Sequence, residues 1–84
     1  MEQDNVRHEE RIEFAMGRLQ AALRFANSLP NREHLRNLED AARAYRVARM
    51  EYFENANDYS LSRVVATWAH VTRILWKIEE IFGR

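Results

Sequence analysis

The sequence predicts an all-α protein, an antiparallel up-down-up bundle of three helices. Two clusters of turn and cap formers divide the chain, and apolar residues recur at helical spacing between them. With only two glycines and one proline, the chain has few other places to turn. We expect one helical domain over residues 1–84, with helices at roughly 4–28, 32–55 and 60–82.

The first helix, over residues 4–28, is predicted from an apolar seam at alternating spacings of three and four. A break follows it, because Pro30 disfavours α geometry at Leu29, and Ser28 or Asn31 can cap the next helix. The seam consists of Ile12, Ala15, Leu19, Ala22 and Ala26, flanked by Met16 and Leu23.

The second helix, over residues 32–55, repeats the pattern and ends in a polar cluster at residues 55–60. Ser60, the last residue of this cluster, and Ser62, two residues later, are expected to cap the third helix. The seam of the second helix consists of Leu38, Ala41, Tyr45, Ala48 and Tyr52, flanked by Leu35 and Ala42.

The third helix, over residues 60–82, carries the most regular signal. Its bulky seam can cover the alanines of the first two helices, and both connections are short, which favours antiparallel neighbours. The seam consists of Leu61, Val64, Trp68, Val71, Leu75, Ile78 and Phe82.

Apolar residues outside these seams predict an interface. A chain of 84 residues buries only a small hydrophobic core and has no cysteine that could form a stabilising disulfide. Oligomerisation can supply the missing stability, so we expect a homodimer. The alternative is that wide apolar faces complete the bundle's own core, with Trp76 packed over Leu35 as a lid. Val47 and Met50, on the outer side of the second helix, are weaker candidates. The expected interface consists of Phe14, Ala21, Phe25, Arg73, Trp76, Ile81 and Phe82.

The sequence contains no recognisable catalytic, cofactor or metal motif. None of the three histidines (His8, His34 and His70) has a glutamate three residues before it, as di-iron bundles require. There is no cysteine nucleophile, and the two glycines lie too far apart for a phosphate-binding loop. We therefore expect a non-enzymatic protein–protein interaction module, acting as an adaptor, antagonist or regulator of a larger protein.

Nucleic-acid binding is the first alternative function. Arginines along one side of the second helix could follow a phosphate backbone. Acidic residues are interspersed among them, and the net charge of the chain is zero, which argues against this function. The arginines are Arg32, Arg36, Arg43 and Arg46.

A ribonuclease is the second alternative. Arg63 and His70 are seven residues apart, so a helix places both on one face. This spacing resembles the Arg-x4-6-His motif of the HEPN ribonucleases, whose histidine and arginine act on the RNA 2′-hydroxyl and phosphate. The resemblance covers these two residues only, and Val64 follows the arginine where that family usually has a polar residue.

Charge patterning predicts a location and a contact. The N-terminal residues are acidic, and charges interrupt the most apolar stretch, 61–82, so we expect a cytoplasmic protein without a membrane span.

Arg49 lies close to the seam of the second helix, opposite Glu9, Glu10 and Glu13 in an antiparallel register. We expect an ion pair across that end of the bundle.

Overall fold

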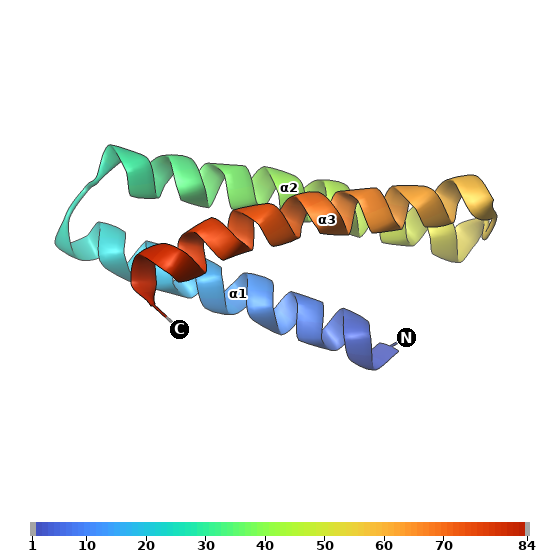
Figure 1. The fold of residues 1–84 in the computed structure, drawn as a ribbon, viewed down its shortest axis with the longest axis horizontal. Coiled ribbons are helices and arrows are strands. Elements are labelled where there is room, and N and C mark those ends of the chain that lie inside the picture. Colours follow the sequence, from blue (N-terminus) through green and yellow to red (C-terminus); the bar gives the residue numbers. More distant parts are fainter. Residues whose placement is uncertain (1, 84) are drawn as a thin grey trace.

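A computed structural model describes the backbone of residues 2–83 and the side chains of residues 5–83. It contains three helices, α1 (Glu2–Phe25), α2 (Leu29–Glu54) and α3 (Asp58–Phe82), and this described range holds no strand. The helices pack as a bundle, which confirms the predicted all-α class. In Figure 1, α3 lies beside α2 along most of its length, whereas α1 runs at an angle to this pair and diverges toward its N-terminus.

The first connection lies three residues earlier than the sequence predicted and has the predicted length. Helix α1 ends at Phe25 rather than residue 28, and α2 begins at Leu29 rather than residue 32. Ser28 has extended backbone angles (φ −75°, ψ 128°) and makes no side-chain cap hydrogen bond. Pro30 falls in the first turn of α2, where its missing N–H needs no partner, so the proline is compatible with an earlier helix start.

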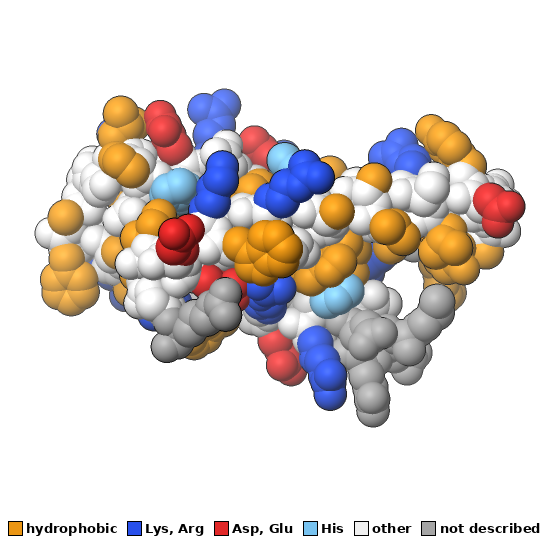
Figure 2. All heavy atoms as spheres, in the orientation of Figure 1, with side chains coloured by type: hydrophobic (Ala, Val, Ile, Leu, Met, Phe, Trp, Pro, Cys, Tyr) orange, Lys and Arg blue, Asp and Glu red, His pale blue; other side chains and the backbone are white. Residues whose placement is uncertain are grey.

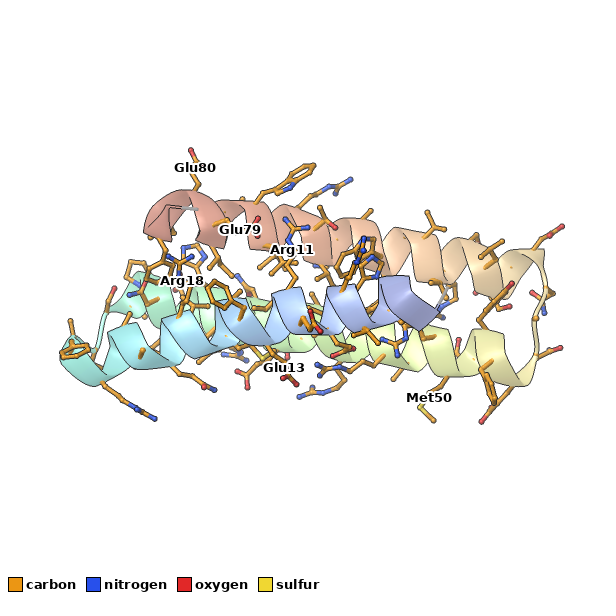
Figure 3. The ribbon with its side chains drawn as sticks, turned by 90° about the horizontal axis from the view of Figure 1, so that it is seen from below. Arg11, Glu13, Arg18, Met50, Glu79 and Glu80 are labelled. Carbon is orange, nitrogen blue, oxygen red and sulfur yellow. The ribbon has the colours of Figure 1, made fainter. Side chains whose placement is uncertain are left out.

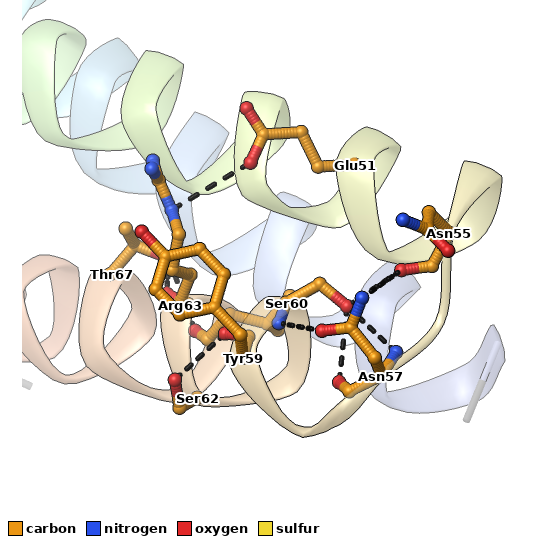
Figure 4. Close-up of polar contacts among 9 residues, drawn as sticks. Glu51, Asn55, Asn57, Tyr59, Ser60, Ser62, Arg63 and Thr67 are labelled. Atoms are coloured by element: carbon orange, nitrogen blue, oxygen red, sulfur yellow. Dashed lines mark hydrogen bonds and ion pairs between the residues drawn. The ribbon is translucent and has the colours of Figure 1, made fainter.

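The second connection places the cap at a different residue from the one expected. Asn57, not Ser60 or Ser62, is the N-cap of α3, which begins at Asp58. The Asn57 side chain accepts a 2.8 Å hydrogen bond from the backbone N–H of Ser60, and the Asn57 N–H donates to the Ser60 hydroxyl at 3.0 Å. This reciprocal capping box, drawn in Figure 4, fixes the start of α3. The Ser60 hydroxyl also donates a 2.9 Å hydrogen bond to the carbonyl of Asn55, the residue that follows α2.

The core lies in the middle of the bundle and matches most of the predicted seams. Small alanines of α1 and α2 let these helices approach closely, and α3 supplies bulkier side chains. Ala26 and Leu61 are corrections, because both are exposed: Ala26 lies beyond the end of α1, and Leu61 (40% exposed) lies near the α2–α3 connection. The buried apolar residues are Ile12, Ala15, Leu19, Leu38, Ala41, Ala42, Tyr45, Ala48, Val71, Leu75 and Ile78.

Two arginines join α1 to the C-terminal half of α3. Arg11 forms a bidentate pair with Glu79, at 2.9 and 2.6 Å, and Figure 3 shows the two side chains pointing toward each other while Glu80 points away. Arg18 donates to the backbone oxygens of Phe82 and Gly83 at 3.0 and 3.2 Å. These contacts hold α1 to α3 at the C-terminal end of α3, away from the α2–α3 connection.

A candidate protein-binding groove

A hollow lies between the N-terminal half of α1 and the end of the α2–α3 hairpin. Figures 1 and 3 both show that α1 stops short of this hairpin end. The groove has a volume of about 930 Å³. Its lining residues come from all three helices and from the α2–α3 connection: Asn5, His8, Glu9, Tyr45, Arg46, Arg49, Met50, Tyr52, Phe53, Glu54, Ala56, Leu61, Val64, Val65 and Trp68.

The outer part of the groove is apolar because it continues the faces that α1 covers elsewhere. Phe53 follows Arg49 by four residues and Arg46 by seven, so it lies on the side of α2 that faces α1. Phe53 is nevertheless 90% exposed, and Val65 on α3 is 62% exposed. Figure 2 shows apolar side chains gathered on α3 toward this end of the hairpin. These side chains leave apolar surface exposed at this end of the hairpin.

The floor of the groove is a cluster of aromatic and polar side chains. The His8 ring stacks on Trp68 with centroids 3.5 Å apart and an interplanar angle of 15°. The Tyr45 hydroxyl lies 2.8 Å from His8 Nδ1 and donates a 3.3 Å hydrogen bond to Asn5 Oδ1. The Tyr45 ring also packs against Trp68 at 5.1 Å. These contacts fix the side chains of the floor relative to one another.

At the inner end of the groove, two arginines bind the same carboxylate. Glu9 of α1 accepts hydrogen bonds from Arg46 at 2.6 Å and from Arg49 at 2.9 Å. The hydrogen bond from Arg46 lowers the pKa of Glu9 and raises the pKa of Arg46, and the charge of Arg49 lowers the pKa of Glu9 further. The Arg49–Glu9 contact confirms the predicted ion pair, and the charge of Glu13 also raises the pKa of Arg46.

The outer end of the groove carries one glutamate. Glu54, on the last turn of α2, lines the groove and is exposed. Glu51 lies one turn earlier, on the flank where it approaches Arg63 of α3 at 3.7 Å. The charged residues that line the groove are therefore Glu9, Arg46 and Arg49 at the inner end and Glu54 at the outer end. Glu54 lies about 140° around α2 from Arg49.

The predicted interface residues are mostly exposed but do not form one patch. Phe14 is 67% exposed and lies under the Arg18 guanidinium, whereas Phe25 is 92% exposed at the end of α1. Trp76 (56% exposed) and Ile81 (54% exposed) are five residues apart, and therefore about 140° apart around α3. Of the other residues in the set, Ala21 and Arg73 are exposed, and Phe82 is partly buried against the core.

The arginines proposed for nucleic acid are not equally available. Arg46 is engaged with Glu9, and Arg43 lies 3.7 Å from Asp40 on the same helix. Arg32 and Arg36 are exposed near the start of α2. The stripe therefore keeps fewer uncompensated charges than its sequence indicates.

The residues proposed for ribonuclease chemistry lie on α3. Arg63 Nε is 3.7 Å from Glu51, and His70 is exposed. Neither residue lines the groove.

In the part of the chain that the structure describes, no three His, Asp or Glu side chains are grouped as metal ligands would be. No helix of this part is long and apolar enough to cross a membrane.

Sequence reasoning missed the outer residues of this groove. Phe53 and Val65 lie outside the a/d seams and were not singled out. Met50 is 63% exposed and points away from the bundle (Figure 3), as its predicted place on the outer side of α2 requires, and it also borders the groove. One pattern in the sequence could have identified Phe53: it follows Arg49 by four residues and Arg46 by seven, so it lies one turn further along the side of α2 that faces α1.

Comparison with known protein families, with curated proteins and with solved structures gave no match to this chain.

Proposed function

We propose that this chain is a non-enzymatic protein–protein interaction module, an antiparallel three-helix bundle that takes an amphipathic helix of a partner protein into the groove. The observation that carries the proposal is the exposure of Phe53, Val65 and Leu61 around a single hollow of about 930 Å³. Large apolar side chains gathered at a concave surface are typical of helix-in-groove recognition.

The dimensions of the groove suit a short helix. Its lining on α2 runs from Tyr45 to Glu54, which is about 14 Å along the helix axis. A partner helix of about three turns covers this length and presents apolar residues at spacings of three and four. Such a helix takes the place beside α2 and α3 that α1 occupies in the middle of the bundle.

The charges of the groove define the partner further. Arg46 and Arg49 outnumber Glu9 among the lining residues of the inner end, and they favour an acidic residue at the end of the partner helix that reaches them. We therefore expect the partner helix to be apolar on one face and to carry a carboxylate near one end of that face.

The proposal is tested with a model peptide and the fluorescence of Trp68. The chain has two tryptophans, so the Trp76→Phe variant leaves Trp68, on the groove floor, as the only reporter. The probe is an amphipathic helical peptide with leucine at helical spacing and glutamate at one end. We expect a saturable change of Trp68 emission at micromolar peptide, and no change with a peptide of the same composition whose apolar face is scrambled.

A pair of variants of equal exposure locates the binding. Phe53→Asp places a charge in the groove and is expected to weaken peptide binding about tenfold or more. Phe25→Asp is the matched control, because Phe25 and Phe53 are 92% and 90% exposed and only Phe53 lines the groove. Equal affinity in both variants, or no response of Trp68 to the peptide, contradicts the proposal.

A further inference from the structure

We propose that residues 5–9 of α1 act as an internal competitor for the partner helix. They cover the inner end of the groove, and a partner helix that carries a carboxylate displaces Glu9 from Arg46 and Arg49. This inference rests on the proposed function, because it assigns a regulator to the same groove. The inhibitory contact lies within one chain, between α1 and the α2–α3 hairpin.

Glu9 occupies the place where the carboxylate of a partner would bind. Its oxygens accept three hydrogen bonds from Arg46, at 2.6, 3.1 and 3.2 Å, and one from Arg49, at 2.9 Å. The side chains of Glu9, Arg46 and Arg49 remain 27%, 42% and 29% exposed, so another carboxylate can approach them. Because Glu9 uses the Nε–Nη2 edge of Arg46, a second carboxylate can form the same bidentate contact only by replacing it.

The neighbouring side chains of α1 cover the aromatic floor of the groove. The His8 ring lies on the face of Trp68, and Asn5 accepts the 3.3 Å hydrogen bond from Tyr45. Trp68 and Tyr45 both line the groove. A partner helix that reaches the arginines passes over the same two rings, so it contacts the whole floor only after residues 5–9 have moved.

This part of α1 can be released without opening the core. Within the described part of α1, Ile12 is the first fully buried residue, and residues 5–11 are exposed or only partly buried. Residues 5–9 are therefore held mainly by side-chain hydrogen bonds and one ring stack, whereas Ile12 and the Arg11–Glu79 pair hold the next turn. Segments with few buried apolar contacts open at a lower free-energy cost than the core.

The competitor lowers the affinity of every partner helix. The free energy needed to release residues 5–9 is subtracted from the free energy of partner binding. A partner with a carboxylate offsets part of this cost, because it binds the arginines that Glu9 leaves. A partner without one leaves these two partly buried guanidinium groups without the anion that Glu9 supplies, so the contact favours acidic partner helices.

Peptide titration of two matched variants tests the inference. In the Trp76→Phe background, the emission of Trp68 reports binding of the amphipathic peptide that carries glutamate at one end. We expect Glu9→Gln to bind this peptide about tenfold more tightly than the parent, because the competitor is weakened. Glu10→Gln removes the same charge from the next residue, which is exposed and does not line the groove, and we expect it to leave the affinity unchanged. Glu13 adds its charge near Arg46 and is present in all three proteins.

Hydrogen exchange of the wild-type chain tests the displacement without a substitution. A helix end that loses its tertiary contacts frays. With saturating peptide, we therefore expect the backbone amides of residues 6–9 to exchange about tenfold faster than in the free chain, while the amide of the buried Leu19 keeps its rate. Amides of residues 6–9 that keep or slow their exchange in the complex overturn the inference, because the peptide then binds beside them.

The two measurements separate this inference from the proposed function. A peptide that binds the parent and Glu9→Gln with equal affinity leaves the proposed function standing and overturns the internal competitor. A peptide that binds neither protein, with circular dichroism showing that both are folded, overturns the proposed function and the competitor with it. A peptide that binds Glu9→Gln more tightly than the parent and Glu10→Gln, and that releases residues 6–9, supports both.

Discussion

Arg49 of α2 donates a 2.9 Å hydrogen bond to Glu9 of α1, and Arg46 donates to the same carboxylate at 2.6 Å. The contact lies where α1 begins to diverge from the hairpin. We expect Glu9→Gln to lower the free energy of unfolding by about 1 to 2 kcal/mol, because it leaves two partly buried guanidinium groups without their anion. Urea denaturation measures the change. Glu10→Gln, on the next and exposed residue, is the control and is expected to have little effect.

The same carboxylate predicts a pH dependence. The pKa of Glu9 is lowered in the folded chain, chiefly by its hydrogen bond with Arg46, from an ordinary value of 4.5. The stabilisation by Glu9 is therefore complete above about pH 4.5 and is lost as the pH falls through the lower pKa of the folded state. The difference in unfolding free energy between wild type and Glu9→Gln is expected to stay constant from neutral pH to about 5 and then to shrink. A difference that grows on acidification contradicts the lowered pKa.

The capping box of α3 predicts a local loss of stability. Asn57→Ala removes the side chain that accepts from the Ser60 N–H, and such a change costs about 1 kcal/mol. Ser62→Ala is the matched control, because its hydroxyl donates only to the Tyr59 carbonyl on the exposed side of α3. Thermal melts of both variants measure the difference. Equal melting temperatures contradict the assignment of Asn57 as the cap.

The two tryptophans are expected to differ in their effect on stability. Trp68 is partly buried, stacks on His8 and packs on Tyr45, so Trp68→Ala is expected to cost about 2 to 4 kcal/mol. Trp76 is 56% exposed, so Trp76→Ala is expected to cost less than about 1 kcal/mol. A loss as large as that of Trp68→Ala assigns Trp76 instead to the role of a lid over Leu35.

The middle of the bundle could be predicted from sequence because it depends on spacing alone. Leu38, Tyr45, Val71 and Leu75 recur at the period of a helix, and all four are buried. The Arg49–Glu9 pair was predictable for a related reason: once the short connections fix the register, opposite charges on facing turns meet. Both inferences need only local geometry and the direction of the helices.

The groove could not be predicted in this way, because it depends on the angle between helices. Nothing in the period of α1 shows that it diverges from α2 and α3 and leaves Leu61 exposed. That angle follows from side-chain packing of alanines on α1 and α2 and from the arginine contacts of Arg11 and Arg18, which sequence spacing does not encode. The Asn57 cap was missed because the cluster at residues 55–60 holds several good cap formers, and only the backbone geometry selects among them.

The unequal packing of the three helices has a consequence for the rate at which the chain folds. The backbone of helix α3 lies close to α2, with which it shares a three-residue connection, and approaches the backbone of α1 at few points. Contacts close in sequence form early, so we expect the α2–α3 hairpin to be largely formed in the folding transition state and α1 to dock afterwards. In stopped-flow measurements, Val71→Ala is then expected mainly to slow folding and Ile12→Val mainly to speed unfolding. The last helix to dock would be the one whose N-terminal half borders the groove.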